Sequence, residues 1–136
     1  MKLIVCVDDI GGMMFFGRRQ SQDRVLREYL LQRVAPGRLW MSEYSGRQFS
    51  PDDSIVIDNA YLAKAEAEDY VFVEDGAYDL SLADEVLLCH WNRRYQADRF
   101  FREDLGANGF KKTDAAQIKG SSHDKITIET YRRIKV

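Results

Sequence analysis

The stretch that decides the fold opens the chain, where Leu3-Ile-Val-Cys-Val-Asp-Asp9 is followed by Gly11-Gly-Met-Met-Phe-Phe-Gly17. A short apolar run that ends in acids is typical of a buried strand, and it predicts one over Lys2–Val7. The glycine-rich segment leads into a predicted helix over Ser21–Arg33, with Asp23 in its first turn. Ligands of open α/β sheets bind beyond the carboxyl ends of strands. Acids and glycines at this point therefore indicate a pocket.

The remaining elements follow from the same kind of pattern. Ser21 is the expected N-cap of the first helix, and an apolar stripe at i, i+1, i+4, i+5 would pack it on the sheet. That stripe consists of Val25, Leu26, Tyr29 and Leu30. Further strands are expected at Arg38–Met41, Ser54–Ile57, Tyr70–Val73, Glu85–Cys89, Phe110–Thr113 and Lys125–Tyr131, a helical turn at Ser45–Phe49 and a short helix within Ala60–Glu68.

Helices alternate with strands early in the chain, whereas strands predominate late. This order predicts a three-layer α/β fold with a mostly parallel sheet and an antiparallel C-terminal edge. With 136 residues, of which 45% are hydrophobic, the chain is long enough for one core and too short for two. We therefore expect a single domain over residues 1–136.

Composition and charge exclude several classes of partner. Twenty basic and 22 acidic residues give a net charge of −2, without a basic patch that alternates with aromatics, so nucleic acid is not an expected partner. No run approaches the roughly 18 apolar residues of a membrane helix. The first apolar run passes directly into Asp8-Asp9, unlike a signal peptide. We therefore expect no association with membranes.

The cysteines and histidines are few. Cys6 and Cys89 lie in apolar runs, where a thiol behaves as a small hydrophobic group, which is typical of a reduced, cytoplasmic protein. Together with His90 and His123 they form no recognisable zinc spacing. The sequence predicts no metal site of this kind.

Several segments, taken in order, resemble the dihydrofolate reductase family. They are Gly12-Met13, Asp23 in its helix, Leu39–Met41 with Ser42–Phe49, Ala83–His90, Tyr95–Phe101 and His123–Arg133. The family opens with a strand, a flexible glycine-containing loop over the active site and a helix that bears one catalytic carboxylate. The resemblance rests on the order and spacing of the segments, and it implies the dihydrofolate reductase-like fold.

The resemblance also implies a pocket. Asp23 falls where the catalytic carboxylate would lie and is the expected polar anchor, and Gly11–Gly17 is the expected lid. The expected pocket residues are Val7, Gly12, Met13, Asp23, Tyr29 and His90. A plainer interpretation stays open, since an acid in a first helical turn complements the helix dipole and Arg27 lies four residues on. The apolar run Met13–Phe16 is likewise either a lid or packed core.

Three departures from the family affect the cofactor. Arg18-Arg19 stand where the family has a Pro-Trp pair, Glu43 replaces an arginine that binds phosphates, and Glu74-Asp75-Gly76 replaces a Gly-Gly pair that cradles them. Carboxylates repel a pyrophosphate, and the middle of the chain is short. We therefore expect no cofactor, and a divergent domain that binds a small planar ligand without normal folate reductase activity.

Two alternatives remain open. The first is an active reductase that uses NADPH to reduce a pterin-like substrate. The second is a receiver-like signalling domain, in which Asp8-Asp9 and Asp58 would bind Mg²⁺ through hard oxygen ligands. Receivers also need a lysine after the fifth strand, where this chain has His90-Trp91-Asn92. That difference counts against the second alternative.

Overall fold

The computed structural model describes residues 1–134. Its elements, in chain order, are β1 (Lys2–Val7), β2 (Gly12–Phe15), β3 (Arg18–Arg19), α1 (Arg24–Val34), β4 (Leu39–Met41), α2 (Glu43–Gly46), β5 (Ile55–Ile57), α3 (Tyr61–Lys64), β6 (Tyr70–Val73), a 3-10 turn (Leu80–Leu82), β7 (Glu85–His90), β8 (Arg99–Phe100), β9 (Phe110–Ile118) and β10 (Ile126–Arg133). Within this part of the chain, none of the helices is both long and apolar enough to cross a bilayer.

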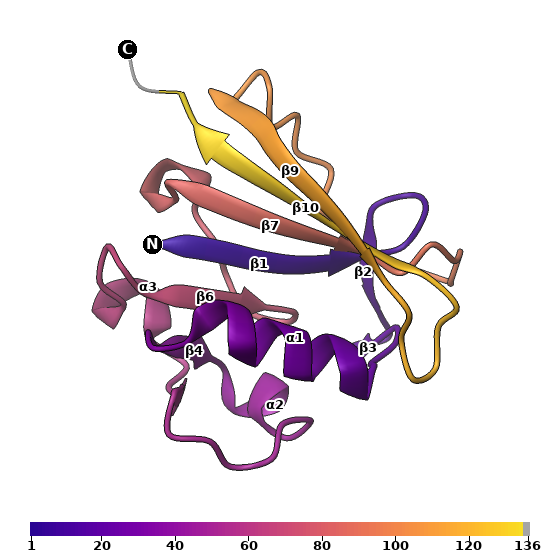
Figure 1. Ribbon diagram of the computed structural model, residues 1–136, viewed down its shortest axis with the longest axis horizontal. Coiled ribbons are helices and arrows are strands. Elements are labelled where there is room, and N and C mark those ends of the chain that lie inside the picture. The colour runs from indigo at the N-terminus through magenta and orange to yellow at the C-terminus, as the bar shows by residue number, and fades with distance from the viewer. Residues whose placement is uncertain (135–136) are drawn as a thin grey trace.

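The main sheet has seven strands in the order β5-β4-β6-β1-β7-β10-β9 (Figure 1). The first five are parallel to one another, whereas β10 runs antiparallel to both β7 and β9. A smaller sheet, β3-β2-β8, is antiparallel throughout. The predicted α/β class, with a mostly parallel sheet and an antiparallel C-terminal edge, is confirmed.

Two hydrophobic cores cover the two faces of the sheet. Along β1, Leu3, Val5 and Val7 point into one core while Ile4 points into the other, as the two-residue repeat of a strand requires. The second core contains Leu26, Leu30 and Val34 of α1, which lies in front of the sheet in Figure 1. The first core contains residues of the smaller sheet, the connecting loops and α3.

The first helix begins later than its predicted N-cap. Asp23, and not Ser21, has the extended backbone of an N-cap, and its side chain accepts hydrogen bonds from the N–H groups of Val25 and Leu26. A carboxylate three residues before the buried Leu26 can reach these free N–H groups, which explains the shift. The helix expected within Ala60–Glu68 is confined to α3, because Ala65 already has extended backbone.

The segment Gly11–Gly17, expected to be a lid, forms most of the β2–β3 hairpin. Met13 and Met14 are buried in β2, whereas the side chains of Phe15 and Phe16 are 38% and 83% exposed. The apolar run therefore divides between core and surface. Phe16 and Gly17 both have positive φ, which makes the tight turn between the two strands.

Candidate functional site at the carboxyl edge of the sheet

β1 and β6 lie side by side in the sheet, and the connections that leave them lead toward opposite edges of it. From β1 the chain crosses through α1 to β4, beyond β6, and from β6 it crosses to β7, on the other side of β1. Connections that diverge in this way leave a crevice at the carboxyl ends of the two strands, where ligands of open sheets bind. The residues that follow β1 and β6 therefore define the candidate site.

Asp8 follows β1 and is buried. Its Oδ1 accepts hydrogen bonds from the backbone N–H groups of Gly12 at 2.7 Å and Ile10 at 3.0 Å, and its Oδ2 accepts from Gln20 Nε2 at 3.1 Å and Tyr95 N at 3.2 Å. Burial opposes ionisation, but these hydrogen bonds outweigh it and lower the pKa of Asp8. The carboxylate thus holds the turn between β1 and β2 together.

Glu74 follows β6, and only 8% of its surface is exposed. Arg19 of β3 donates from Nε to Glu74 Oε2 at 3.1 Å and from Nη2 to Glu74 Oε1 at 3.2 Å. Gln48 Nε2 donates to the same Oε1 at 2.8 Å, and the Arg19 Cζ lies 4.4 Å from the centre of the Tyr44 ring. We call Glu74, Tyr44 and Gln48 the cradle. The carboxylate of Glu74 and the ring of Tyr44 both contact the guanidinium of Arg19. The amide of Gln48 holds the carboxylate in place.

The loop after Glu74 is held by neutral and cationic partners. Ser42 donates its hydroxyl to Asp75 Oδ1 at 2.7 Å, and Arg99 donates to the backbone carbonyls of Asp75 and Gly76. Tyr61 packs its hydroxyl against Gly76, where it leaves no room for a Cβ. Burial, followed by the nearby charge of Asp75, raises the pKa of Tyr61 to about 12.

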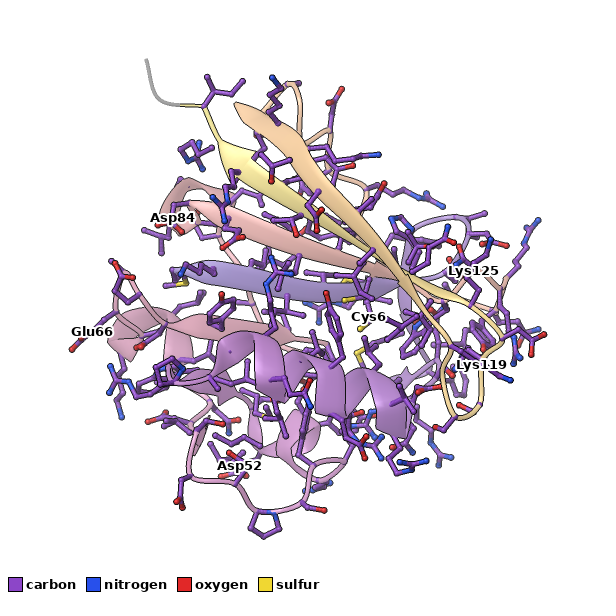
Figure 2. All side chains as sticks on the ribbon, viewed as in Figure 1. Cys6, Asp52, Glu66, Asp84, Lys119 and Lys125 are labelled. Carbon is purple, nitrogen blue, oxygen red and sulfur yellow. The ribbon has the colours of Figure 1, made fainter. Side chains whose placement is uncertain are left out.

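Asp23 lies at the start of α1 and contacts the β9–β10 loop. Figure 2 labels Lys119 and Lys125 in this loop. Asp23 is 2% exposed. Besides capping α1, it accepts hydrogen bonds from Ser121 N at 3.0 Å and Ser122 N at 2.9 Å. Gly120 lies so close to the carboxylate that a Cβ there would overlap it. This is an acid surrounded by protein donors.

His123 completes the group around Asp23. Its Nδ1 lies 3.0 Å from Asp23 Oδ2, and its Nε2 lies 2.9 Å from Ser21 Oγ and 3.1 Å from Tyr95 Oη. The Trp91 ring stacks on the imidazole with centroids 4.6 Å apart. Burial raises the pKa of Asp23, but hydrogen bonds from Ser122, His123 and Ser121 outweigh it and hold that pKa well below its usual range.

The other predicted pocket residues are divided between the two faces. Val7 and Met13 belong to the first core, and Tyr29 packs against the second. Gly12 lies against Ala97 and Asp8, with no space for a larger residue. His90 contacts the carboxylate of Glu129 on β10. The structure therefore brings Val7 and Met13 together and places Tyr29 on the opposite face from them.

The cradle is not evident from the sequence. Glu74 is recognisable there as an acid after a strand, but its partner Arg19 lies 55 positions earlier, in a hairpin whose sequence is typical of a loop. Two residues at that separation carry no periodic signal. The contact joins two sheets, since Arg19 lies on β3 of the smaller sheet and Glu74 follows β6 of the main one.

The receiver-like alternative is not supported by the sheet order. Asp58 follows β5, and two strands, β4 and β6, separate β5 from β1, which carries Asp8 and Asp9 at its end. Asp58 Oδ2 instead pairs with Lys64 Nζ at 2.6 Å. Among residues 1–134, no three His, Cys, Asp or Glu side chains are grouped so that they could hold a metal ion.

Comparison with known proteins gives a structural likeness and no match in sequence. No family model matches the chain, and no curated protein matches it. A solved structure of dihydrofolate reductase from Enterococcus faecalis, complexed with NADP(H) and RAB-propyl, is similar with a TM-score of 0.67. The likeness covers 98% of this chain and 96% of that one, at 14% identity. The chain therefore has the dihydrofolate reductase-like fold.

Proposed function

We propose that this protein is a divergent dihydrofolate reductase-like domain that binds a small planar ligand and lacks normal folate reductase activity. The observation that carries the proposal is the cradle. A buried carboxylate beside the face of a tyrosine ring, near the carboxyl ends of β1 and β6, offers a planar ligand that displaces Arg19 both a stacking surface and a polar anchor. In this proposal Glu74 takes the anchoring role that the sequence assigned to Asp23.

The residues after β6 do not fit a nicotinamide dinucleotide. A dinucleotide needs N–H groups or cations against its phosphates. Here Glu74 and Asp75 stand at that position, and Glu43 opens α2, a helix of only four residues. Each unfavourable carboxylate near a phosphate costs on the order of 1–4 kcal/mol at a surface-like dielectric. The proposed function therefore includes no cofactor.

An active NADPH-dependent reductase of a pterin-like substrate is the second candidate. The observation that favours it is the likeness to a reductase whose structure was solved with NADP(H). In this case Asp23 would relay a proton to the substrate. The oxygens of Asp23 already accept from two serine N–H groups and face His123, so that role requires the β9–β10 loop to move.

The test of the proposal uses the wild-type protein and planar heterocycles of different charge, including pterins, purines and reduced nicotinamide cofactor. At 100 times its dissociation constant, a bound ligand should add about 2.7 kcal/mol of stability and raise the melting temperature by several degrees. We expect such a shift with a planar heterocycle, weak or no binding of NADPH by fluorescence, and no oxidation of NADPH with dihydrofolate by absorbance. Micromolar NADPH binding with turnover that Asp23→Asn abolishes would establish the second candidate instead.

A further inference from the structure

A side chain of the protein itself already occupies the cradle. The guanidinium of Arg19 presents two N–H donors to the two oxygens of Glu74, and it lies over the face of Tyr44. A planar cation held by a forked pair of hydrogen bonds and an aromatic face is the recognition pattern of guanidinium and amidinium groups. The cradle is thus complementary to one chemical class.

The remaining contacts are also shaped for such a group. Arg19 Nη2 donates to the backbone carbonyl of Tyr44 at 3.1 Å, which adds a third acceptor beside the carboxylate. Gln48 donates to Glu74 from the other side and fixes the position of the carboxylate. The side chain of Arg19 is 18% exposed and that of Glu74 only 9%. Arg19 therefore lies on the solvent side of the carboxylate and covers it.

Arg19 lies on a short strand at the surface, which allows its side chain to move away from Glu74. β3 has two residues, pairs with β2 through Met14–Arg19 and Phe15–Arg18, and is also held by a hydrogen bond from Arg19 N to Tyr44 Oη at 2.7 Å. The turn that joins the two strands, Phe16-Gly17, is exposed. Residues 15–18, which include the turn, are exposed and make few buried contacts, and such segments open at lower cost than the core of a domain. By contrast, the cradle residues are fixed by larger elements. Glu74 directly follows β6 of the main sheet, Tyr44 lies in α2, and Gln48 lies just after α2.

We propose that the cradle is a binding site for a small planar cation that carries a guanidinium or amidinium group, and that Arg19 competes with this cation for the site. This inference rests on the proposed function and names its ligand class. An incoming cation replaces Arg19 at Glu74 while β3 and the Phe16-Gly17 turn move away and Met13 and Met14 of β2 stay in the core. Because Arg19 occupies the site most of the time, the apparent affinity of the wild-type protein is lowered by the fraction of molecules in which the site is open.

The test removes the competitor and supplies its head group in solution. Methylguanidinium chloride is titrated into Arg19→Ala while the melting temperature and tryptophan fluorescence are recorded. We expect a saturable rise in melting temperature, with an affinity at least about tenfold higher than for the wild-type protein. Methylammonium chloride at the same concentration has the same charge without the planar fork and should give no saturable rise.

Two variants serve as controls. Arg18→Ala removes the neighbouring exposed arginine and leaves the cradle occupied, so it should respond to methylguanidinium no more than the wild-type protein. Arg19→Ala/Glu74→Gln removes the charge that the cation recognises and should lose the response. If Arg19→Ala alone does not fold, refolding in methylguanidinium should restore a cooperative transition, and methylammonium should not.

A folded Arg19→Ala that responds equally to both cations, or to neither, would show that Arg19–Glu74 is only a structural ion pair. An unfolded Arg19→Ala that methylguanidinium does not restore would lead to the same conclusion. The proposed function can survive that result, because binding of a neutral or anionic planar heterocycle to the wild-type protein tests it separately. The opposite result is also distinguishable. If methylguanidinium binds Arg19→Ala but no planar ligand binds the wild-type protein, the cation site is supported and the proposed function is wrong.

Discussion

Asp23 and His123, 100 positions apart in the chain, meet through the Oδ2 of one and the Nδ1 of the other at 3.0 Å. The contact joins the first turn of α1 to the loop between β9 and β10. Both side chains are almost wholly buried, at 0% and 1% exposure. A buried acid in this position has to be fully hydrogen-bonded, and its neighbours in the β9–β10 loop supply the donors.

Replacing Asp23 should therefore destabilise the protein more than an ordinary cap does. Asp23→Ala removes an N-cap, at about 0.5–2 kcal/mol, and leaves buried donors without an acceptor, at about 1–3 kcal/mol. We expect a total loss of about 1.5–5 kcal/mol in urea unfolding. Asp79, which caps the exposed 3-10 turn, is the matched control, and Asp79→Ala should cost less than about 1 kcal/mol. Equal losses in the two variants would refute the anchoring role of Asp23.

The same carboxylate predicts how stability depends on pH. The pKa of Asp23 is lower in the folded state than the usual value of about 3.9 for an unfolded chain. Its contribution is therefore complete above that usual value and is lost as the pH falls toward the folded pKa. The free energy of unfolding should drop as the pH decreases below about 5, and Asp23→Asn should flatten this dependence. The lowered pKa of Asp8 acts in the same direction, so the variant should retain some slope.

A second pair, the partly buried Cys6 and the buried Cys89, predicts slow thiol chemistry. The two residues are register partners on β1 and β7, and both are free thiols. The hydrogen bond with Cys89, together with burial, raises the pKa of the Cys6 thiol well above its usual value. Each unit of increase lowers the thiolate fraction tenfold, so a thiol reagent at pH 8 should react at least about tenfold more slowly with the folded protein than in urea.

Cys89→Ser tests the cause of that slow reaction. The substitution replaces the thiol partner that contributes most to the raised pKa of Cys6. We expect Cys6 to react faster in the folded variant than in the folded wild-type protein, while the two rates agree in urea. Native thiols that react as quickly as unfolded ones would contradict the placement of both residues in the sheet.

The sequence predicts the parts of the fold that depend on local pattern. β6 occupies Tyr70–Val73 and β1 occupies Lys2–Val7, both as expected. Short apolar runs between polar residues are typical of buried strands. β9 extends to Ile118, well beyond the expected Thr113. Its side chains from Lys111 onward are largely exposed, as in a strand at the edge of a sheet, and such a strand lacks the apolar alternation that reveals a half-buried one.

The site is less predictable than the fold. The sequence predicts that Asp23 lies near the start of a helix. Its hydrogen-bond partners lie in a loop about 100 residues later, and no local pattern in the sequence predicts that contact. The same holds for Arg19 and Glu74, which meet across two sheets, from β3 of the smaller one and the residue after β6 of the main one. Contacts between distant segments depend on strand order, which the alternation of helices and strands does not specify.

The last prediction concerns β10, the strand that closes the chain. Ile126 and Ile128 are 0% and 1% exposed and belong to the core beneath α1. Ile128→Ala should cost about 2–5 kcal/mol, a large part of the roughly 5–15 kcal/mol that stabilises a typical domain. Ile134, just beyond the strand, is 53% exposed, so Ile134→Ala should change stability by less than about 0.5 kcal/mol.

Deleting the chain from His123 onward should abolish cooperative unfolding, since it removes β10 and exposes the edge of β7. A truncated chain that still melts cooperatively near the wild-type temperature would show that β10 is dispensable, and with it the antiparallel edge of this sheet.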